Sequence, residues 1–290
     1  GTFYRDQEPA EYASFPLVMY RGLNRVTYDS VSAMLESYYA EKNILTRIHQ
    51  KSADLRRIVQ AALDRTNKKR ILQEKQLKDT QKKEKYRIYG ELINTYGYNL
   101  KPDCRSFEAL NYYTNEMTTV PLDPTLTPSE NAKKYFDRYN KLKRTEEALS
   151  VLLQETVEEA QHLESVAMAL DLAMSEDDLS QIKEELTQSG YIRYRNTGSP
   201  KKKKIASKPL HYLSGDGYHM YVGKNNFQNE ELTFKLASGS DWWFHAKGQP
   251  GSHVIVKANG EELPDKTFEE AGRLAAYYSK GRGSEKVEVD

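Results

Sequence analysis

The sequence predicts a multi-domain α+β protein in which a long antiparallel coiled-coil hairpin with a small tip module precedes a compact α+β domain. Residues 30–96 contain no proline and one glycine, and residues 128–188 repeat the apolar spacing of a helix. Residues 191–290 change to short apolar–polar alternations with more glycine and proline, which is typical of strands and turns. A chain of 290 residues is also long for one domain.

Composition divides the chain into five segments, which are residues 1–28, 29–96, 97–126, 127–190 and 191–290. We interpret the first as the tail of a preceding domain. The second and fourth are the coiled-coil helices, and the third is a tip module rich in proline, tyrosine and asparagine. The last is the compact α+β domain. Because the chain starts with glycine and stops within a predicted strand, we expect a piece of a longer protein, with the last domain incomplete at its C-terminus.

The first long helix is predicted because apolar residues recur at intervals of three and four. The recurring residues are Val31, Leu35, Tyr38, Leu45, Ile48, Leu55, Val59 and Ala62. In the tail before it, Phe15–Tyr20 is predicted to form a strand. Two helices of an ordinary bundle are the alternative to a coiled coil, which is disfavoured because the sequence offers no further helices to complete a bundle.

The second long helix carries its own start and stop signals. Thr127 is a good N-cap, Pro128 suits the first helical position and Glu130 completes a capping box. A second capping sequence at Ser175–Asp178 predicts a break just before it. Gly190 suits the C-terminal end, where a left-handed conformation is common.

Four alternating stretches predict the strands of the last domain. They are Tyr218–Val222, Leu232–Leu236, Trp242–His245 and His253–Lys257. Phe268–Lys280 is predicted to form one amphipathic helix. The linker before this domain is basic through Lys201, Lys202, Lys203 and Lys204.

Charge is polarised along the predicted hairpin. With 43 basic and 42 acidic residues the chain is not uniformly basic, but residues 65–87 hold ten basic and three acidic residues, and residues 155–185 hold ten acidic and one basic. A basic stretch of this kind suits a phosphate backbone, although a solvated helix face is an equal alternative. The expected RNA contacts are Lys68, Lys69, Arg70, Lys75, Lys78, Lys82 and Lys83.

The single cysteine, Cys104, excludes a disulfide framework and a zinc site built from several thiolates. It favours a reducing, cytoplasmic compartment. No apolar run approaches the length of a membrane span, and no signal peptide is visible.

Two strings in the last domain are unusually polar and aromatic. Gly223–Asn229 places a lysine and several carboxamides after a strand, where they suit phosphate, ribose or base edges, or a capped turn. In Asp241–Val254, alternation puts the two tryptophans on opposite faces, so that one is core and the other can stack on a base. The turn Pro250–Ser252 offers amides to a phosphate. The candidate RNA-binding residues are Lys224, Asn225, Asn226, Asn229, Asp241, Trp242, Trp243, His245, Lys247, Gly251, Ser252 and His253.

An enzyme would have to start from His245 and His253, as metal ligands or as acid and base. Their spacing matches no metal motif, and paired histidines in a strand-rich domain are more often structural. We therefore expect no catalytic residue, no metal site and no cofactor.

The two strings also carry a family resemblance. Asp241–Val254, with Gly223–Asn226 upstream, resembles the RNA-binding domain of the NFACT family, and Leu122–Phe136 with Tyr139–Lys143 is similar to its coiled-coil and middle region. The resemblance implies a ribosome quality-control factor that binds obstructed large ribosomal subunits carrying peptidyl-tRNA and helps to add an alanine tail to the stalled chain. The implied partners are the large subunit, its rRNA, and peptidyl- and alanyl-tRNA, with no membrane and no small-molecule substrate.

The chain departs from the family pattern in lacking most of the N-terminal domain, with its Asp–Arg pair for tRNA recognition, so tRNA selection is assigned to no residue. Some members bear the name of fibronectin-binding proteins, which makes a surface adhesin for fibronectin or fibrinogen the alternative function. No signal, anchor motif or wall-sorting tail in this sequence supports export.

Overall fold

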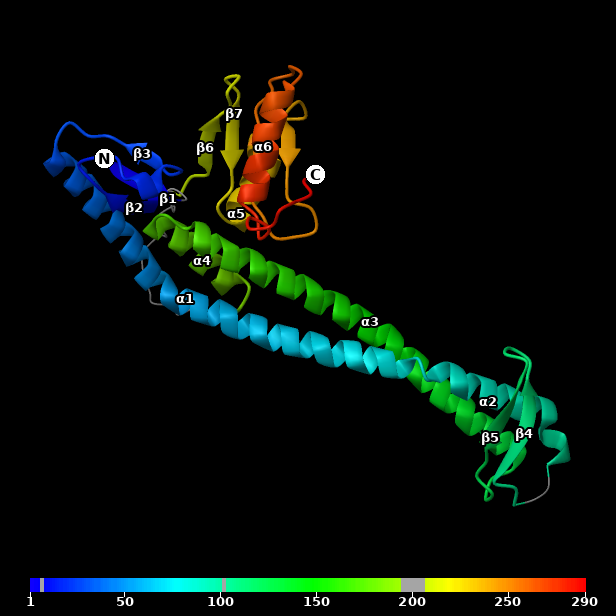
Figure 1. Ribbon diagram of the computed structural model, residues 1–290. Coiled ribbons are helices and arrows are strands. Elements are labelled where there is room, and N and C mark those ends of the chain that lie inside the picture. The colour runs from blue at the N-terminus through cyan, green and yellow to red at the C-terminus, as the bar shows by residue number, and fades with distance from the viewer. Residues whose placement is uncertain (6–7, 101–102, 194–206) are drawn as a thin grey trace. The chain divides into compact units, whose positions relative to one another are not determined.

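The computed structural model consists of two compact units (Figure 1). The first unit combines residues 1–63 with 161–290, and the second comprises residues 64–160. The residues that the structure describes are 1–5, 8–100, 103–193 and 207–290. The basic linker Lys201–Lys204 lies outside them.

The first unit begins with a small antiparallel sheet. Strands β1 (Thr2–Arg5), β2 (Glu8–Tyr12) and β3 (Asn24–Val26) pair in the order β2-β1-β3. The strand predicted for Phe15–Tyr20 is wrong, since Val18–Tyr20 form the 3₁₀ turn η1. Val18 and Met19 are 69% and 78% exposed, so no neighbouring strand covers their apolar side chains.

Helices α1 (Val31–Thr80) and α3 (Pro128–Leu172) contribute to both units and form the predicted antiparallel coiled coil. In the first unit, Arg47 of α1 pairs with Glu176 of α4 (Glu176–Gln188), and Arg56 further along α1 pairs with Asp171 of α3, so the residue numbers run in opposite directions. The buried seam contains Ile48, Leu55, Val59, Leu163, Val166, Leu170, Ile182 and Leu186.

The predicted helix ends are confirmed. Glu130 accepts from the Thr127 amide at 2.8 Å, and the Thr127 hydroxyl accepts from the Glu130 amide at 3.3 Å. Ser175 and Asp178 form a second capping box at the start of α4. Gly190, with φ +79°, occupies the left-handed region just after that helix.

The first coiled-coil helix, predicted over 29–96, is interrupted. α1 ends at Thr80 and α2 (Lys83–Tyr96) starts after two turn residues. The buried Thr80 hydroxyl donates to the Leu77 carbonyl at 2.6 Å, a local bond that competes with helical hydrogen bonding and bends helices. No proline or glycine marks the position.

In the second unit, the tip module is a β-hairpin that packs on the helices. Strands β4 (Ser106–Asn111) and β5 (Glu116–Pro121) pair antiparallel after the short turn η2 (Gly97–Asn99). Its core contains Tyr89, Leu92, Ile93, Ala109, Val120 and Ala132. Cys104 lies just before β4, partly exposed, and its thiol donates to the Ser106 carbonyl at 2.9 Å.

The last domain is a four-stranded antiparallel sheet with a helix on one face (Figure 1). Its strands are β6 (Leu210–Leu213), β7 (His219–Val222), β8 (Trp242–Phe244) and β9 (Val254–Val256), in the order β6-β7-β9-β8. Helix α6 (Asp265–Tyr277) covers the face that carries Met220, Val222, Phe244, Val254 and Val256.

The strand predicted for Leu232–Leu236 is wrong. This stretch is the π-helical turn η3, and it continues α5 (Asn226–Glu231). Of its apolar residues only Leu232 is buried, while Phe234 is 81% exposed, so the alternation does not mark a buried strand face. None of the helices in the described ranges is long and apolar enough to cross a membrane.

Two helical glycines should respond oppositely to alanine. A Cβ on Gly90 of α2 would lie 2.9 Å from the Phe136 ring of α3, whereas a Cβ on Gly272 of α6 would meet nothing within 4 Å. Gly90→Ala is expected to destabilise by about 1–3 kcal/mol through overpacking. Gly272→Ala should stabilise by about 0.5–1 kcal/mol through helix propensity. Urea unfolding measures both, and a stabilised Gly90→Ala variant would show that the Phe136 ring moves away freely.

Candidate nucleic-acid interface

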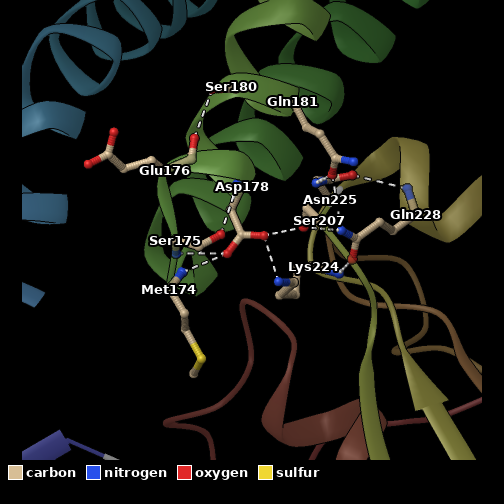
Figure 2. A network of polar contacts seen from close by, with 10 residues as sticks. All are labelled: Met174, Ser175, Glu176, Asp178, Ser180, Gln181, Ser207, Lys224, Asn225 and Gln228. Atoms are coloured by element: carbon tan, nitrogen blue, oxygen red, sulfur yellow. Dashed lines mark hydrogen bonds and ion pairs between the residues drawn. The ribbon is translucent and has the colours of Figure 1, made fainter. Parts of the chain in front are cut away.

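Lys224, the predicted phosphate ligand, is buried rather than exposed. It lies two residues after the end of β7, is 8% exposed, and its ammonium donates to Asp178 Oδ1 of α4 at 2.5 Å (Figure 2). The next residue, Asn225, caps α5 by accepting from the Gln228 amide at 3.0 Å. The turn that starts α5 therefore turns Lys224 towards α4.

Asp178 is the acceptor around which these contacts gather. Its Oδ1 also accepts from the Ser207 hydroxyl, and its Oδ2 accepts from the amides of Met174 and Ser175 at 2.9 and 3.0 Å. Burial opposes ionisation of this carboxyl, but the bonds from Lys224, Ser207 and the Met174 amide outweigh it and hold its pKa below the ordinary value. A buried ion pair satisfied in this way ties α4 to the last domain.

Carboxamides extend this contact along α4. Asn225 donates to Gln181 Oε1 at 2.7 Å, and Gln228 donates to the same oxygen at 3.0 Å (Figure 2). Asn226 donates to Glu185 Oε1 at 2.6 Å, and burial raises the pKa of that carboxyl. We call the whole set the α4–α5 polar network; its members are Asp178, Gln181, Glu185, Ser207, Lys224, Asn225, Asn226 and Gln228.

Asn229 has a different partner, the loop before β9. It accepts from the His253 amide at 3.0 Å and donates to the Gly251 carbonyl at 3.3 Å. A Cβ on Gly223 would lie 2.1 Å from Asn229 Oδ1, so glycine is required for this approach. The predicted proximity of the two strings is thus observed, but it is made by internal hydrogen bonds. RNA contact by Lys224 and the carboxamides stays a prediction.

Asp241 is an internal anchor as well. Its side chain is fully buried and accepts from the Ser238 amide at 2.8 Å, the Ala258 amide at 3.1 Å and the Lys257 ammonium. Burial opposes its ionisation, but the bonds from Lys257 and Ser238 lower its pKa to about 2. The Asp241 carboxylate is therefore not exposed for contact with RNA in this structure.

The two tryptophans lie on opposite faces of β8, and both are partly exposed, at 43% for Trp242 and 39% for Trp243. Trp242 packs edge-on against Phe268 of α6, with ring centroids 4.6 Å apart. On the other face, Trp243 stacks with His245 at 5.7 Å and meets His253 edge-on at 5.2 Å. Of the two, Trp243 is therefore the tryptophan on the face away from the core.

Burial disfavours the charged form of both histidines. Burial lowers the pKa of His253 to about 4, assisted by the neighbouring His245, and burial also lowers the pKa of His245. His253 Nδ1 lies 2.7 Å from the Thr233 hydroxyl. Among the described residues, no group of three or more histidine, cysteine and carboxylate side chains is arranged to hold a metal ion.

This neutral histidine should make stability depend on pH. Because His253 titrates near 4 when folded and near 6.5 when unfolded, the unfolded chain binds more protons between those values. The stabilisation is complete above pH 6.5 and falls by roughly 2–3 kcal/mol as the pH drops to 4. His253→Asn, which keeps a partner for Thr233, should flatten this loss in urea titrations, while exposed His49→Asn should not. An equal slope in both variants would contradict the assignment.

The remaining predicted residues of the second string differ in exposure. Lys247 is exposed and pairs with Asp290 at 3.0 Å. Ser252 is 2% exposed, and its amide donates to the Tyr278 carbonyl at 2.8 Å, so it is not free for phosphate. Gly251 bridges to Ser279.

The seven predicted basic contacts, which lie on α1, in the turn after it and at the start of α2, fall into two groups. Arg70, Lys82 and Lys83 pair with Glu74, Asp79 and Glu146 respectively. The other four side chains are exposed and make no ion pair within the described ranges; they are Lys68, Lys69, Lys75 and Lys78. We call these four the free α1 lysines, and they are the better candidates for phosphate contacts.

Sequence reasoning missed the partners on α4. Asp178, Gln181 and Glu185 lie 46, 43 and 39 residues before Lys224 and read as part of an acidic helix face. Their spacing of three and four residues places them on one side of α4, and this spacing was the signal in the sequence that could have grouped them. Nothing in the sequence indicated which element that side would meet.

Comparisons with known proteins agree with this architecture. The family profile described as "NFACT N-terminal and middle domains" matches residues 1–205, and "NFACT protein RNA binding domain" matches residues 208–289. Two curated relatives, both named "Rqc2 homolog RqcH", are 41% identical in Streptococcus suis and 36% identical in Bacillus subtilis. The alignments cover 92% and 91% of this chain but 48% and 46% of those proteins, so the chain spans about half their length.

A solved structure is also similar. It is described as the C-terminal of the fibronectin/fibrinogen-binding protein from Streptococcus suis, and it is 36% identical to this chain with a TM-score of 0.61. The match covers 84% of this chain and 83% of that one.

Proposed function

Because the chain belongs to the NFACT family, we propose that it is part of a ribosome quality-control factor that binds obstructed large ribosomal subunits carrying peptidyl-tRNA. In this proposal it supports alanine tailing of the stalled nascent chain. The observation that carries the proposal is the RNA-binding domain of the family at residues 208–289, preceded by a coiled coil with exposed, unpaired lysines. The role of this part is binding to rRNA and tRNA, with no catalytic step.

Electrostatics support the coiled coil as one of the contacts. The free α1 lysines carry four exposed positive charges within eleven residues of one helix. Positive charges at this density neutralise phosphates and release their counterions, which makes the affinity depend steeply on salt.

The test is co-sedimentation of the chain with isolated large ribosomal subunits across a salt series. The expected result is saturable binding whose affinity falls linearly with salt on a double-logarithmic scale. The rival adhesin is motivated by the printed description of the Streptococcus suis structure. A parallel pull-down on immobilised fibronectin separates the two, since binding to fibronectin without binding to subunits would overturn the ribosomal role.

A further inference from the structure

A cluster of rings lies on the face of the last sheet that α6 leaves uncovered. In the antiparallel register, His211 of β6 is opposite Tyr221 of β7, and Leu213 is opposite His219. The His211 ring lies edge to edge with His219, with centroids 5.0 Å apart and planes at 17°, and it stacks on Tyr221 at 4.9 Å and 28°. His211 and His219 are exposed and Tyr221 is half-buried. We call these three the β6–β7 ring cluster.

The cluster shares its face with Trp243. Tyr221 is opposite Ile255 of β9, which is opposite Trp243 of β8, and residues directly opposite each other project to the same side. Ile255 is fully buried and β9 packs against η3, so the centre of this face is covered while both flanks carry exposed rings. Phe234 of η3 is 81% exposed. Rings therefore stand on three of the four strands.

The geometry of the cluster suits a flat ligand. The rings are nearly parallel, and His211 Nε2 lies 2.8 Å from His219 Nδ1, a hydrogen bond that fixes the orientation of both imidazoles. An exposed pair of aligned rings on neighbouring strands is the arrangement on which sheet-based RNA readers stack unpaired bases. A base-paired duplex cannot use it, because its bases are already stacked within the helix.

We propose that the β6–β7 ring cluster is a stacking site for the unpaired bases of single-stranded RNA. This inference rests on the proposed function, that the last domain binds RNA, and names the kind of RNA that it takes. The alternative is that the rings only stabilise the sheet, since cross-strand pairs commonly make ring contacts between neighbouring strands. Such pairs would not explain why two nearly coplanar imidazoles remain exposed on the face that also carries Trp243.

The test is fluorescence anisotropy of the complete chain with labelled unstructured oligonucleotides, oligouridylate and oligoadenylate, and with an RNA duplex of the same length. We expect tighter binding to the single strands. The variant His211→Ala, His219→Ala, Tyr221→Ala should bind them about tenfold less tightly or worse, as expected for loss of a stacked base. Its duplex affinity should stay unchanged. The variant His211→Phe, His219→Phe, Tyr221→Phe keeps the rings and should keep the affinity.

The outcomes separate this site from the proposed function. If the parent chain binds no RNA at all, the proposed function itself fails. If the parent binds but the alanine variant binds single strands equally well, the stacking site is wrong and RNA binding stands. If the alanine variant unfolds, the phenylalanine variant tests the stacking site instead. Weak binding of single-stranded RNA by the folded phenylalanine variant would overturn the stacking site. If the alanine variant loses binding to large subunits but keeps its affinity for the oligonucleotides, the rings contact a protein. That result would also overturn the proposed stacking site.

Discussion

Asp178→Ala is expected to destabilise the chain by about 3–5 kcal/mol, because it leaves the Lys224 ammonium buried without its partner. The same substitution removes the acceptor for the Ser207 hydroxyl and for the amides of Met174 and Ser175. Urea unfolding followed by circular dichroism measures the loss. Hydrogen exchange should show the largest change in α4 and in the turn that starts α5.

The same helix turn provides the matched control. Glu176 is two residues away, but its side chain is 53% exposed and pairs with Arg47 and Lys51 at the surface. Glu176→Ala should change stability little, since exposed ion pairs contribute little. The double variant Asp178→Asn, Lys224→Met keeps an acceptor for the cap amides and removes the buried charge, so it should recover much of the loss. If Asp178→Ala is no less stable than Glu176→Ala, the network does not hold α4 to the last domain.

Reversal of the four free α1 lysines should weaken binding to large ribosomal subunits by about 100-fold or more near 0.1 M salt. The variant is Lys68→Glu, Lys69→Glu, Lys75→Glu and Lys78→Glu. Each phosphate contact contributes about 0.7–0.9 to the slope of log affinity against log salt, so losing four should flatten that slope by about 3. Co-sedimentation across a salt series gives both quantities.

The control for this variant reverses lysines in acidic surroundings. Lys51 and Lys183 are exposed and lie near or within α4, whose first turn is acidic. Lys51→Glu with Lys183→Glu changes the net charge without touching the basic stretch of α1. We expect this control to weaken subunit binding less, per reversed charge, than the fourfold variant does. An unchanged salt slope in the fourfold variant would show that this face of α1 is only solvated.

Local signals predicted the helices well. The capping boxes at Thr127 and Ser175 and the glycine at position 190 are short-range features, and each lies where the sequence places it. Three strands of the last sheet, β7, β8 and β9, were predicted within a few residues, because their alternation reflects one covered face, whereas β6 was not predicted.

Features that depend on distant partners could not be predicted. Leu232–Leu236 alternates like a strand, but the cap at Asn225 starts a helix before it and no neighbouring strand pairs with it. Lys224 was predicted to bind phosphate because it lies among a glycine and several carboxamides just after a strand. Its partner, Asp178, is brought to it only by packing of α4 on the last domain.

The positions of Cys104 and the tryptophans have a practical consequence for spectroscopy. Both tryptophans of the chain belong to the first unit, and its one cysteine belongs to the second, where the thiol is partly exposed. A thiol-reactive dye on Cys104 thus reports melting of the second unit, while intrinsic tryptophan emission reports the first. The unaltered sequence carries one reporter for each unit, so a single temperature ramp reveals whether the two units melt together or one after the other.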